Sequence, residues 1–357
     1  MKKERSSNIE LLRIIAMMLI IAHHSVVHGG LSKLGDSNFN NLLILFMGTG
    51  GKLGVNVFVI ITGFFDVGKK FKVGKVAAVE GSCWFYGILC AIGALIYGTV
   101  TFDSIKISQF AFPLWNNLYW FMTCFAILYC LSGYINKLIE NISKNKLAIL
   151  IVILFVINFA SSFRFLRLYP AFGKMGQNRL VWFVMLYLIG AFLRLYPNTF
   201  TKNIKQELIA LAGFMVLYVS KIAIGGFTKT TITYALFSDF SLIFAILLFL
   251  IFKNIKMGCI KPINVIASCM IGVYLFHDNP FIRQIIWKKI SNIGGYVSGR
   301  SLIFREGITV IVIMAIGIVL DLIRQNVFSP IFRKLGQKFV APLYEKISLK
   351  INADEKA

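Results

Sequence analysis

The chain has 357 residues, of which 57% are hydrophobic and 15% charged, and its formal net charge at pH 7 is +23. A mean hydropathy of +0.75 and repeated apolar runs of about 17 to 24 residues predict an all-α, polytopic membrane protein with the lipid bilayer as partner. The positive charge lies in the links between these runs, where it reports membrane topology, so we expect no nucleic-acid partner.

The apolar runs predict ten transmembrane helices. They cover about residues 9–30, 53–66, 76–98, 117–135, 147–163, 180–195, 207–224, 233–252, 263–277 and 304–322. Ten spans leave both termini on one side, and most of the 38 Lys and Arg residues lie in the links and termini of that side. The positive-inside rule therefore places both termini in the cytoplasm. We expect one helical bundle over residues 1–324 and a basic cytoplasmic tail over 325–357.

The first span, about residues 9–30, carries charged and titratable groups that a passive membrane anchor has no reason to keep. Arg13 and His24 are eleven residues apart, so on a helix they lie within about 20° of one face and roughly 16 Å apart along the axis. Glu10, three residues before Arg13, can pair with it. His23 points about 100° away from His24, and we expect it to form a hydrogen bond elsewhere.

This spacing predicts a function that joins the two membrane surfaces. With the N-terminus inside, Arg13 lies near the cytoplasmic surface and His24 lies in the outer half of the membrane. A reaction at His24 could then join a cytoplasmic reagent to an extracytoplasmic acceptor. Imidazole titrates near neutral pH, which suits a general base. Side chains that could contact such an acceptor are His28, one turn after His24, together with Asn56, Thr62, Trp120 and His277.

The six cysteines fall within or beside apolar runs, without CxxC spacing or nearby histidine partners. This pattern predicts neither a disulfide framework nor a zinc site. We expect packing roles for these residues, no metal site and no bound cofactor.

Four ordered stretches resemble the signature elements of one protein family. They are Glu10-x-x-Arg13 followed by ten residues and His24, GKLGVNVFVIITGFF at 51–65, YWFMTCFAILYCLSGYINKLI at 119–139, and IGVYLFHDNP at 271–280. Together they resemble the integral-membrane acyltransferase family 3, whose members O-acetylate cell-surface polysaccharides and related glycans. The third stretch is similar to members from Gram-positive bacteria, and the resemblance covers almost the whole chain.

The chain departs from the family pattern in three places. Thr62 stands where the family usually has Ser, and Asn56 where Asp is common. The family's arginine pair after the second span is replaced by four lysines, Lys69, Lys70, Lys72 and Lys75. Lysine supplies charge to a phosphate but not the bidentate fork of arginine.

The resemblance implies an O-acyltransferase in the plasma membrane, with acetyl-CoA or another acyl-CoA as donor. Arg13 and the four lysines would hold the CoA nucleotide at the inner surface, while the pantetheine arm extends toward His24. His24 would act as general base, with Arg13 and Glu10 in support; an acyl-imidazole intermediate is the competing chemistry. The acceptor would be a cell-surface glycan or a lipid-linked sugar.

A different function class also fits polar residues inside membrane spans. A transporter or flippase for a glycan precursor or small solute could use Glu80, His24 and Arg13 as a proton or substrate pathway. Such proteins often contain inverted repeats and paired broken helices, and the sequence shows neither. Acceptor-dependent release of free CoA from acetyl-CoA separates the two functions.

Overall fold

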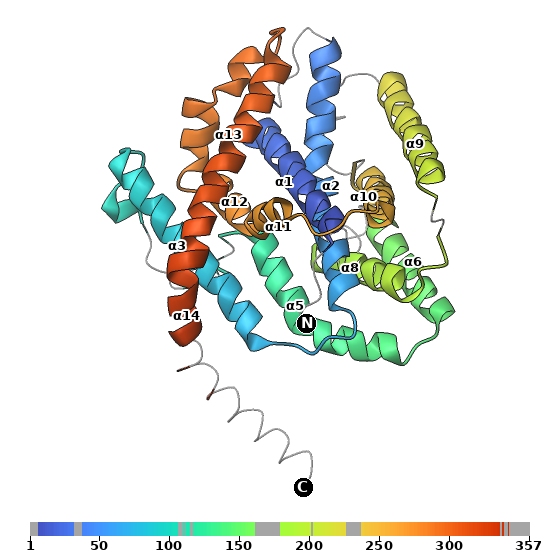
Figure 1. Ribbon diagram of the computed structural model, residues 1–357. Coiled ribbons are helices and arrows are strands. Elements are labelled where there is room, and N and C mark those ends of the chain that lie inside the picture. Colours follow the sequence, from blue (N-terminus) through green and yellow to red (C-terminus); the bar gives the residue numbers. More distant parts are fainter. Residues whose placement is uncertain are drawn as a thin grey trace.

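The computed structural model (Figure 1) describes residues 6–31, 38–105, 110, 112–114, 116, 118–160, 179–200, 203–225, 237–335, 338 and 342. These residues form helices and connecting turns, with no strand among them, which confirms the all-α prediction. The helices in chain order are α1 (Ser7–His28), α2 (Asn38–Asp66), α3 (Val73–Ile96), η1 (Phe102–Ser104), α5 (Trp120–Glu140), α6 (Lys144–Ala160), α8 (Arg179–Leu195), α9 (Ile204–Gly225), α10 (Phe237–Asn254), α11 (Lys261–Ser268), α12 (Met270–His277), η3 (Ile285–Ile290), η4 (Ile293–Tyr296), α13 (Leu302–Ile323), η5 (Arg324–Phe328) and α14 (Ser329–Leu335).

Five of the described helices are long and apolar enough to cross a membrane. They are Ser7–His28, Phe39–Asp66, Val73–Ile96, Trp120–Glu140 and Leu302–Ile331. The ninth predicted span is not one helix, because the chain breaks at Cys269 into α11 and α12. The last of the five runs through residue 324, so one continuous helical stretch crosses the expected start of the tail. The count of ten crossings and the domain division remain predictions.

Links that were predicted to share a membrane side come together at one end of the bundle. The N-terminal residues of α1 are tied to the link after α10: Ser7 N–H donates to Gly258 O at 3.1 Å, and Ser6 Oγ donates to Met257 O at 2.9 Å. Asn136, near the end of α5, donates to Asp66 O at 2.9 Å. These contacts place the start of α1 beside the link after α10, and the end of α5 beside the end of α2; the side of the membrane on which they lie stays a prediction.

The central helix is α2, which packs on α1, α8 and α10 (Figure 1). Two glycines permit its closest contact. A Cβ atom at Gly63 would overlap the backbone of Tyr187 on α8, and a Cβ atom at Gly190 would overlap the backbone of Ile60 on α2. Small residues that let helix backbones approach closely are a common packing device in membranes.

We expect Gly190→Ala to lower the thermal unfolding midpoint of the detergent-purified protein. The added methyl group has no room against Ile60, and overpacking of this kind costs about 1–3 kcal/mol. Gly213→Ala, on α9, is the matched control because a Cβ atom there meets nothing within 4 Å. An equal midpoint for the two variants would contradict the α2–α8 packing.

A buried polar cluster fixes α12 against α3 and α13. Asp321, fully buried, accepts hydrogen bonds from the Tyr86 hydroxyl at 3.0 Å and from Arg324 Nε at 2.6 Å. Gly272 on α12 leaves the space that the Asp321 side chain fills. Since α12 ends at His277, this cluster also sets the position of that histidine.

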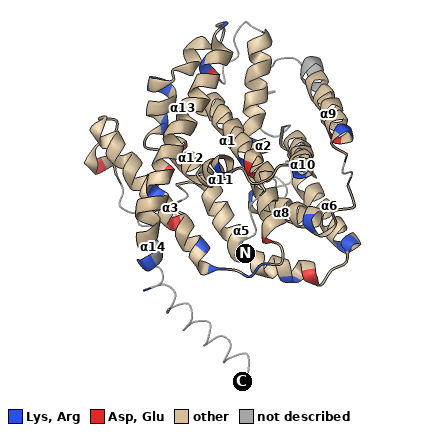
Figure 2. Ribbon diagram, viewed as in Figure 1, with Lys and Arg blue, Asp and Glu red and all other residues tan. Residues whose placement is uncertain are grey.

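The Lys and Arg residues of the described helices lie mainly near helix ends and in links, and long stretches of helix between them carry no charged residue (Figure 2). Large exposed side chains include Ile96, Phe304 and Ile311. A lipid environment requires such a surface, since no water is available there to solvate polar groups. The structure therefore describes a membrane protein.

Candidate active site

Two buried histidines from distant parts of the chain meet where α1 packs on α12. His24 Nδ1 lies 2.9 Å from His277 Nε2, and His277 Nδ1 lies 2.6 Å from Val273 O. A carbonyl oxygen only accepts, so His277 Nδ1 carries a proton and, in the neutral ring, its Nε2 accepts one from His24 Nδ1. In this arrangement, assigned from the hydrogen bonds, His24 keeps an unprotonated Nε2.

A carboxylate and a third histidine lie on the Nε2 side of His24. Asp278 Oδ1 is 3.8 Å from His24 Nε2 and 3.5 Å from His28 Nε2. Because His28 follows His24 by four residues, both rings lie on one face of α1. Asp278 reaches them from the C-terminal end of α12. The Asp278 carboxylate can therefore stabilise the imidazolium that forms when His24 accepts a proton.

The turn that carries Asp278 is held by hydrogen bonds on its other side. The Tyr119 hydroxyl donates to Leu275 O at 2.9 Å, and Asn279 Nδ2 donates to Tyr86 O at 3.3 Å and to the Tyr119 hydroxyl. Tyr119 and Asn279 are both buried. These contacts fix the turn relative to α3 and to the start of α5.

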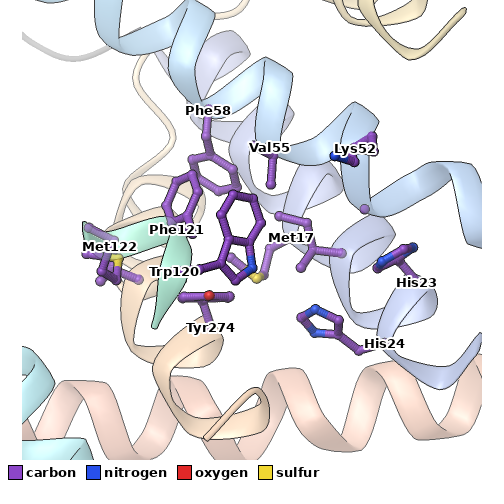
Figure 3. A pocket seen from close by; sticks show the side chains of 13 residues that line it. Met17, His23, His24, Lys52, Val55, Phe58, Trp120, Phe121, Met122 and Tyr274 are labelled. Atoms are coloured by element: carbon purple, nitrogen blue, oxygen red, sulfur yellow. The ribbon is translucent and has the colours of Figure 1, made fainter. Parts of the chain in front are cut away.

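A pocket opens beside His24, with about 650 Å³ of empty space that includes the part open to solvent. Side chains from α1, α2, α5 and α12 surround it (Figure 3). The lining residues are Met17, Ile20, His23, His24, Gly51, Lys52, Val55, Phe58, Trp120, Phe121, Met122, Ile271 and Tyr274. This mainly apolar pocket with a few polar groups has the character of a small-molecule site.

Two polar groups in the pocket wall have free hydrogen-bonding capacity. The buried Tyr274 hydroxyl makes no hydrogen bond of good geometry with a described residue, although it lies close enough to the Asp278 carboxylate to interact with it. Lys52 forms no salt bridge with any residue that the structure describes. A donor and a cation are therefore available to a substrate.

The predicted acceptor contacts are divided between the pocket and its surroundings. Trp120 lines the pocket, with the Arg179 guanidinium 4.6 Å from its ring centroid. Asn56 is buried elsewhere: its Oδ1 accepts a hydrogen bond from Trp182 Nε1 at 2.8 Å, and its Nδ2 donates to Ser241 Oγ at 3.2 Å. The Thr62 hydroxyl donates to Phe58 O on its own helix at 2.9 Å. Trp120 and His24 thus line the same pocket, whereas Asn56 and Thr62 are not among its lining residues.

His23 takes the position expected from its angle on the helix. Its Nδ1 lies 2.7 Å from Gly48 O on α2, although the ring also borders the pocket. A Cβ atom at Gly51 would overlap this ring. The predicted hydrogen bond away from His24 is therefore confirmed.

The charges predicted to hold the donor lie at the other end of α1. Arg13 pairs with Glu10 at 3.1 Å, as expected, and its guanidinium is 6.0 Å from the Phe65 ring centroid at the end of α2. Lys69 and Lys75 pair with Asp66 at 3.1 and 3.2 Å. The four predicted lysines, Lys69, Lys70, Lys72 and Lys75, are all exposed. Arg13 and the lysine group therefore share one end of the bundle.

Two site residues, Lys52 and Tyr274, were not assigned a role from the sequence. Lys52 could have been noticed as a charge within an apolar run. Asp278 follows His277 directly, but only the fold shows that its carboxylate approaches His24 and His28. Tyr274 had no distinguishing signal among the 13 tyrosines of the chain.

The structure is thus an apolar helical bundle that encloses a histidine pair beside a pocket. Residues 6–323 match the family described as acyltransferase domain, which is most of the chain. The chain belongs to acyltransferase family 3. No curated protein and no solved structure matches it. Family membership supports a membrane acyltransferase and gives no support to the transporter alternative.

Proposed function

We propose that this protein is a plasma-membrane O-acyltransferase. It moves an acyl group, most simply acetyl, from cytoplasmic acyl-CoA to a hydroxyl of an extracytoplasmic glycan or lipid-linked sugar. The observation that carries this proposal is the hydrogen bond that ties His24 Nδ1 to His277 and leaves Nε2 available beside the pocket. The acyltransferase family assignment supplies the reaction class.

The donor enters from the Arg13 end of the bundle. With both termini in the cytoplasm, Arg13 and the four lysines face the inner surface, where they bind the phosphates of CoA. The pantetheine arm then extends along α1 into the apolar pocket. This places the thioester carbonyl near His24, roughly 16 Å along the helix axis from Arg13.

The acceptor hydroxyl occupies the space among His24, His28 and Asp278. Its proton passes to His24 Nε2 while its oxygen attacks the thioester carbonyl carbon. The Tyr274 hydroxyl donates a hydrogen bond to the oxyanion that develops on the carbonyl oxygen. The C–O bond forms, the C–S bond breaks, and the imidazolium returns its proton to the leaving thiolate. Asp278 stabilises the imidazolium in between.

Two further groups support substrate binding. The Trp120 ring, at the pocket wall, offers an apolar face to a sugar ring. Lys52 is available to the negative charge on the leaving sulfur. The competing acyl-imidazole route uses the same Nε2 atom as nucleophile, so both routes require His24.

The test compares cell-surface glycans from cells with the intact gene, with a deletion, and with the deletion restored by the intact gene. Mass spectrometry measures base-labile acyl groups. The proposal expects an acyl mark that the deletion loses and the restored gene returns, and the same spectra identify the acceptor. Unchanged acylation in the deletion, together with accumulation of a lipid-linked sugar or solute on one membrane side, would replace the proposal with the transporter.

Neutralising the four lysines to glutamine should raise KM for acyl-CoA about tenfold to a hundredfold. Each exposed ion pair with phosphate contributes up to about 1 kcal/mol, and the effect should shrink at high salt. The matched control is Lys288→Gln with Lys289→Gln, two exposed lysines on η3. Initial rates with isolated membranes measure KM. An equal rise of KM in the control would show that the four lysines have no specific role in acyl-CoA binding.

A further inference from the structure

A set of metal-ligand atoms meets at the C-terminal end of α1. His24, His28 and Asp278 each offer one ligand atom, and these atoms lie within 4.8 Å of one another. Asp278 Oδ1 is 3.8 Å from His24 Nε2 and 3.5 Å from His28 Nε2. Two histidines four residues apart on one helix, with a carboxylate from elsewhere, form a common zinc-binding pattern.

The distances approach those of a bound ion. Zinc binds imidazole nitrogen and carboxylate oxygen at about 2.0–2.2 Å, so neighbouring ligand atoms of a tetrahedral site lie roughly 3.3 Å apart. The two Asp278 distances exceed this value by a few tenths of an ångström, and the three ligand atoms all lie within 4.8 Å of one another. Side-chain rotation must therefore draw the two imidazoles and the carboxylate closer together around an ion. The fourth position remains for water.

The surrounding hydrogen bonds have the form that metal sites require. A metal-bound histidine usually donates its second ring N–H to a carbonyl, carboxylate or other acceptor, which fixes the ring and its tautomer. His24 donates from Nδ1 to His277, which in turn donates to Val273 O. His24 Nε2 is therefore presented as a ligand atom.

The chemistry of the ligands selects the class of ion. Calcium and magnesium prefer shells of oxygen atoms, whereas imidazole suits zinc, cobalt, nickel and copper. His24 and Asp278 are buried, and His28 is half-buried. An ion could enter past His28.

We propose that His24, His28 and Asp278 form a zinc-binding site, and that a bound ion inhibits acyl transfer. Zinc and the proton of the acceptor hydroxyl use the same lone pair on His24 Nε2, so they exclude each other. The inhibitory effect rests on the proposed function, but the binding itself does not. The cysteine spacing indicated no metal site; this ligand set comes from histidines and a carboxylate that the fold brings together.

The binding experiment uses the full chain in detergent, purified without a histidine tag and stripped with EDTA. The exposed thiols Cys130 and Cys259 are alkylated first, because thiolates also bind zinc. Zinc chloride is titrated by calorimetry, and cobalt chloride by its visible absorption, which reports tetrahedral coordination. We expect one ion per chain.

Three variants assign the ion to its ligands. His28→Ala and Asp278→Asn should each weaken zinc binding by about 100-fold or more, since loss of a supporting residue alone costs 10–100-fold. His23→Asn is the matched control, because its imidazole lies outside the cluster and bonds Gly48 O. Absence of binding to the intact chain, or equal binding by all variants, overturns the site.

The activity measurement separates this proposal from the proposed function. If both hold, zinc inhibits acyl transfer competitively with the acceptor, and EDTA reverses the inhibition. If the protein binds zinc but the metal-free protein shows no acyl transfer, the proposed function is wrong and the zinc site stands. If the protein binds no zinc and its acyl transfer is insensitive to zinc, the zinc site is wrong and the proposed function stands.

Discussion

His24→Asn should lower the rate of acyl transfer by about 10²–10⁴-fold, the usual contribution of a positioned general base. The Asn side-chain amide can still donate to His277 from the position of Nδ1, but it lacks the basic Nε2 atom. The variant therefore removes the proton acceptor while keeping the contact between α1 and α12. Acceptor-dependent release of free CoA from acetyl-CoA, measured with isolated membranes at equal protein abundance, gives the rate.

The adjacent histidine supplies the control for this experiment. His23→Asn makes the same chemical change one residue earlier, and the amide can retain the hydrogen bond to Gly48 O. We expect only a few-fold effect on the rate, since His23 Nδ1 is directed to α2 and not to His277. Equal losses in the two variants would indicate damage to α1 packing, and full activity in His24→Asn would end the assignment of His24 as base or nucleophile.

Tyr274→Phe should reduce kcat by about 10²–10³-fold with little change in KM for acyl-CoA. Removal of one oxyanion donor typically costs this much, because the donor acts on charge that develops only in the transition state. The hydroxyl is well suited to the role: it is buried near the pocket and makes no ordinary hydrogen bond to a described residue. Phenylalanine keeps the ring that packs near His24.

Tyr218→Phe is the matched control for Tyr274→Phe. Tyr218 on α9 is also buried, but its hydroxyl pairs with Thr49 and lies outside the pocket lining. Its loss should affect stability by about 1 kcal/mol and leave kcat unchanged. A KM effect without a kcat effect in Tyr274→Phe would assign the hydroxyl to ground-state binding and exclude an oxyanion role.

The two expected effects concern different atoms of the same transition state. His24 acts on the acceptor's proton, whereas Tyr274 acts on the donor's carbonyl oxygen. Because both groups serve one transition state, the double variant should lose less than the product of the two single losses. Independent, fully multiplicative losses would show that the two residues do not act together.

Local patterns in the sequence determined the helical membrane fold and the polar face of the first helix. Apolar runs long enough to span a bilayer predict helices without knowledge of their neighbours. The three-residue spacing of Glu10 and Arg13 likewise sufficed to predict their ion pair, which the structure contains. Such contacts follow from helix geometry alone, since residues three or four apart lie on one face.

Only the tertiary structure decided which distant groups meet His24. His277 lies 253 residues further along the chain, and no helical periodicity relates two such positions. Their contact depends on the break at Cys269 and on the buried Asp321 cluster that places α12. Sequence spacing also left the partner of the Thr62 hydroxyl open, and in the structure this hydroxyl donates to Phe58 O on its own helix. Spacing specifies only the face on which a side chain lies, because packing between helices sets the neighbours available to it.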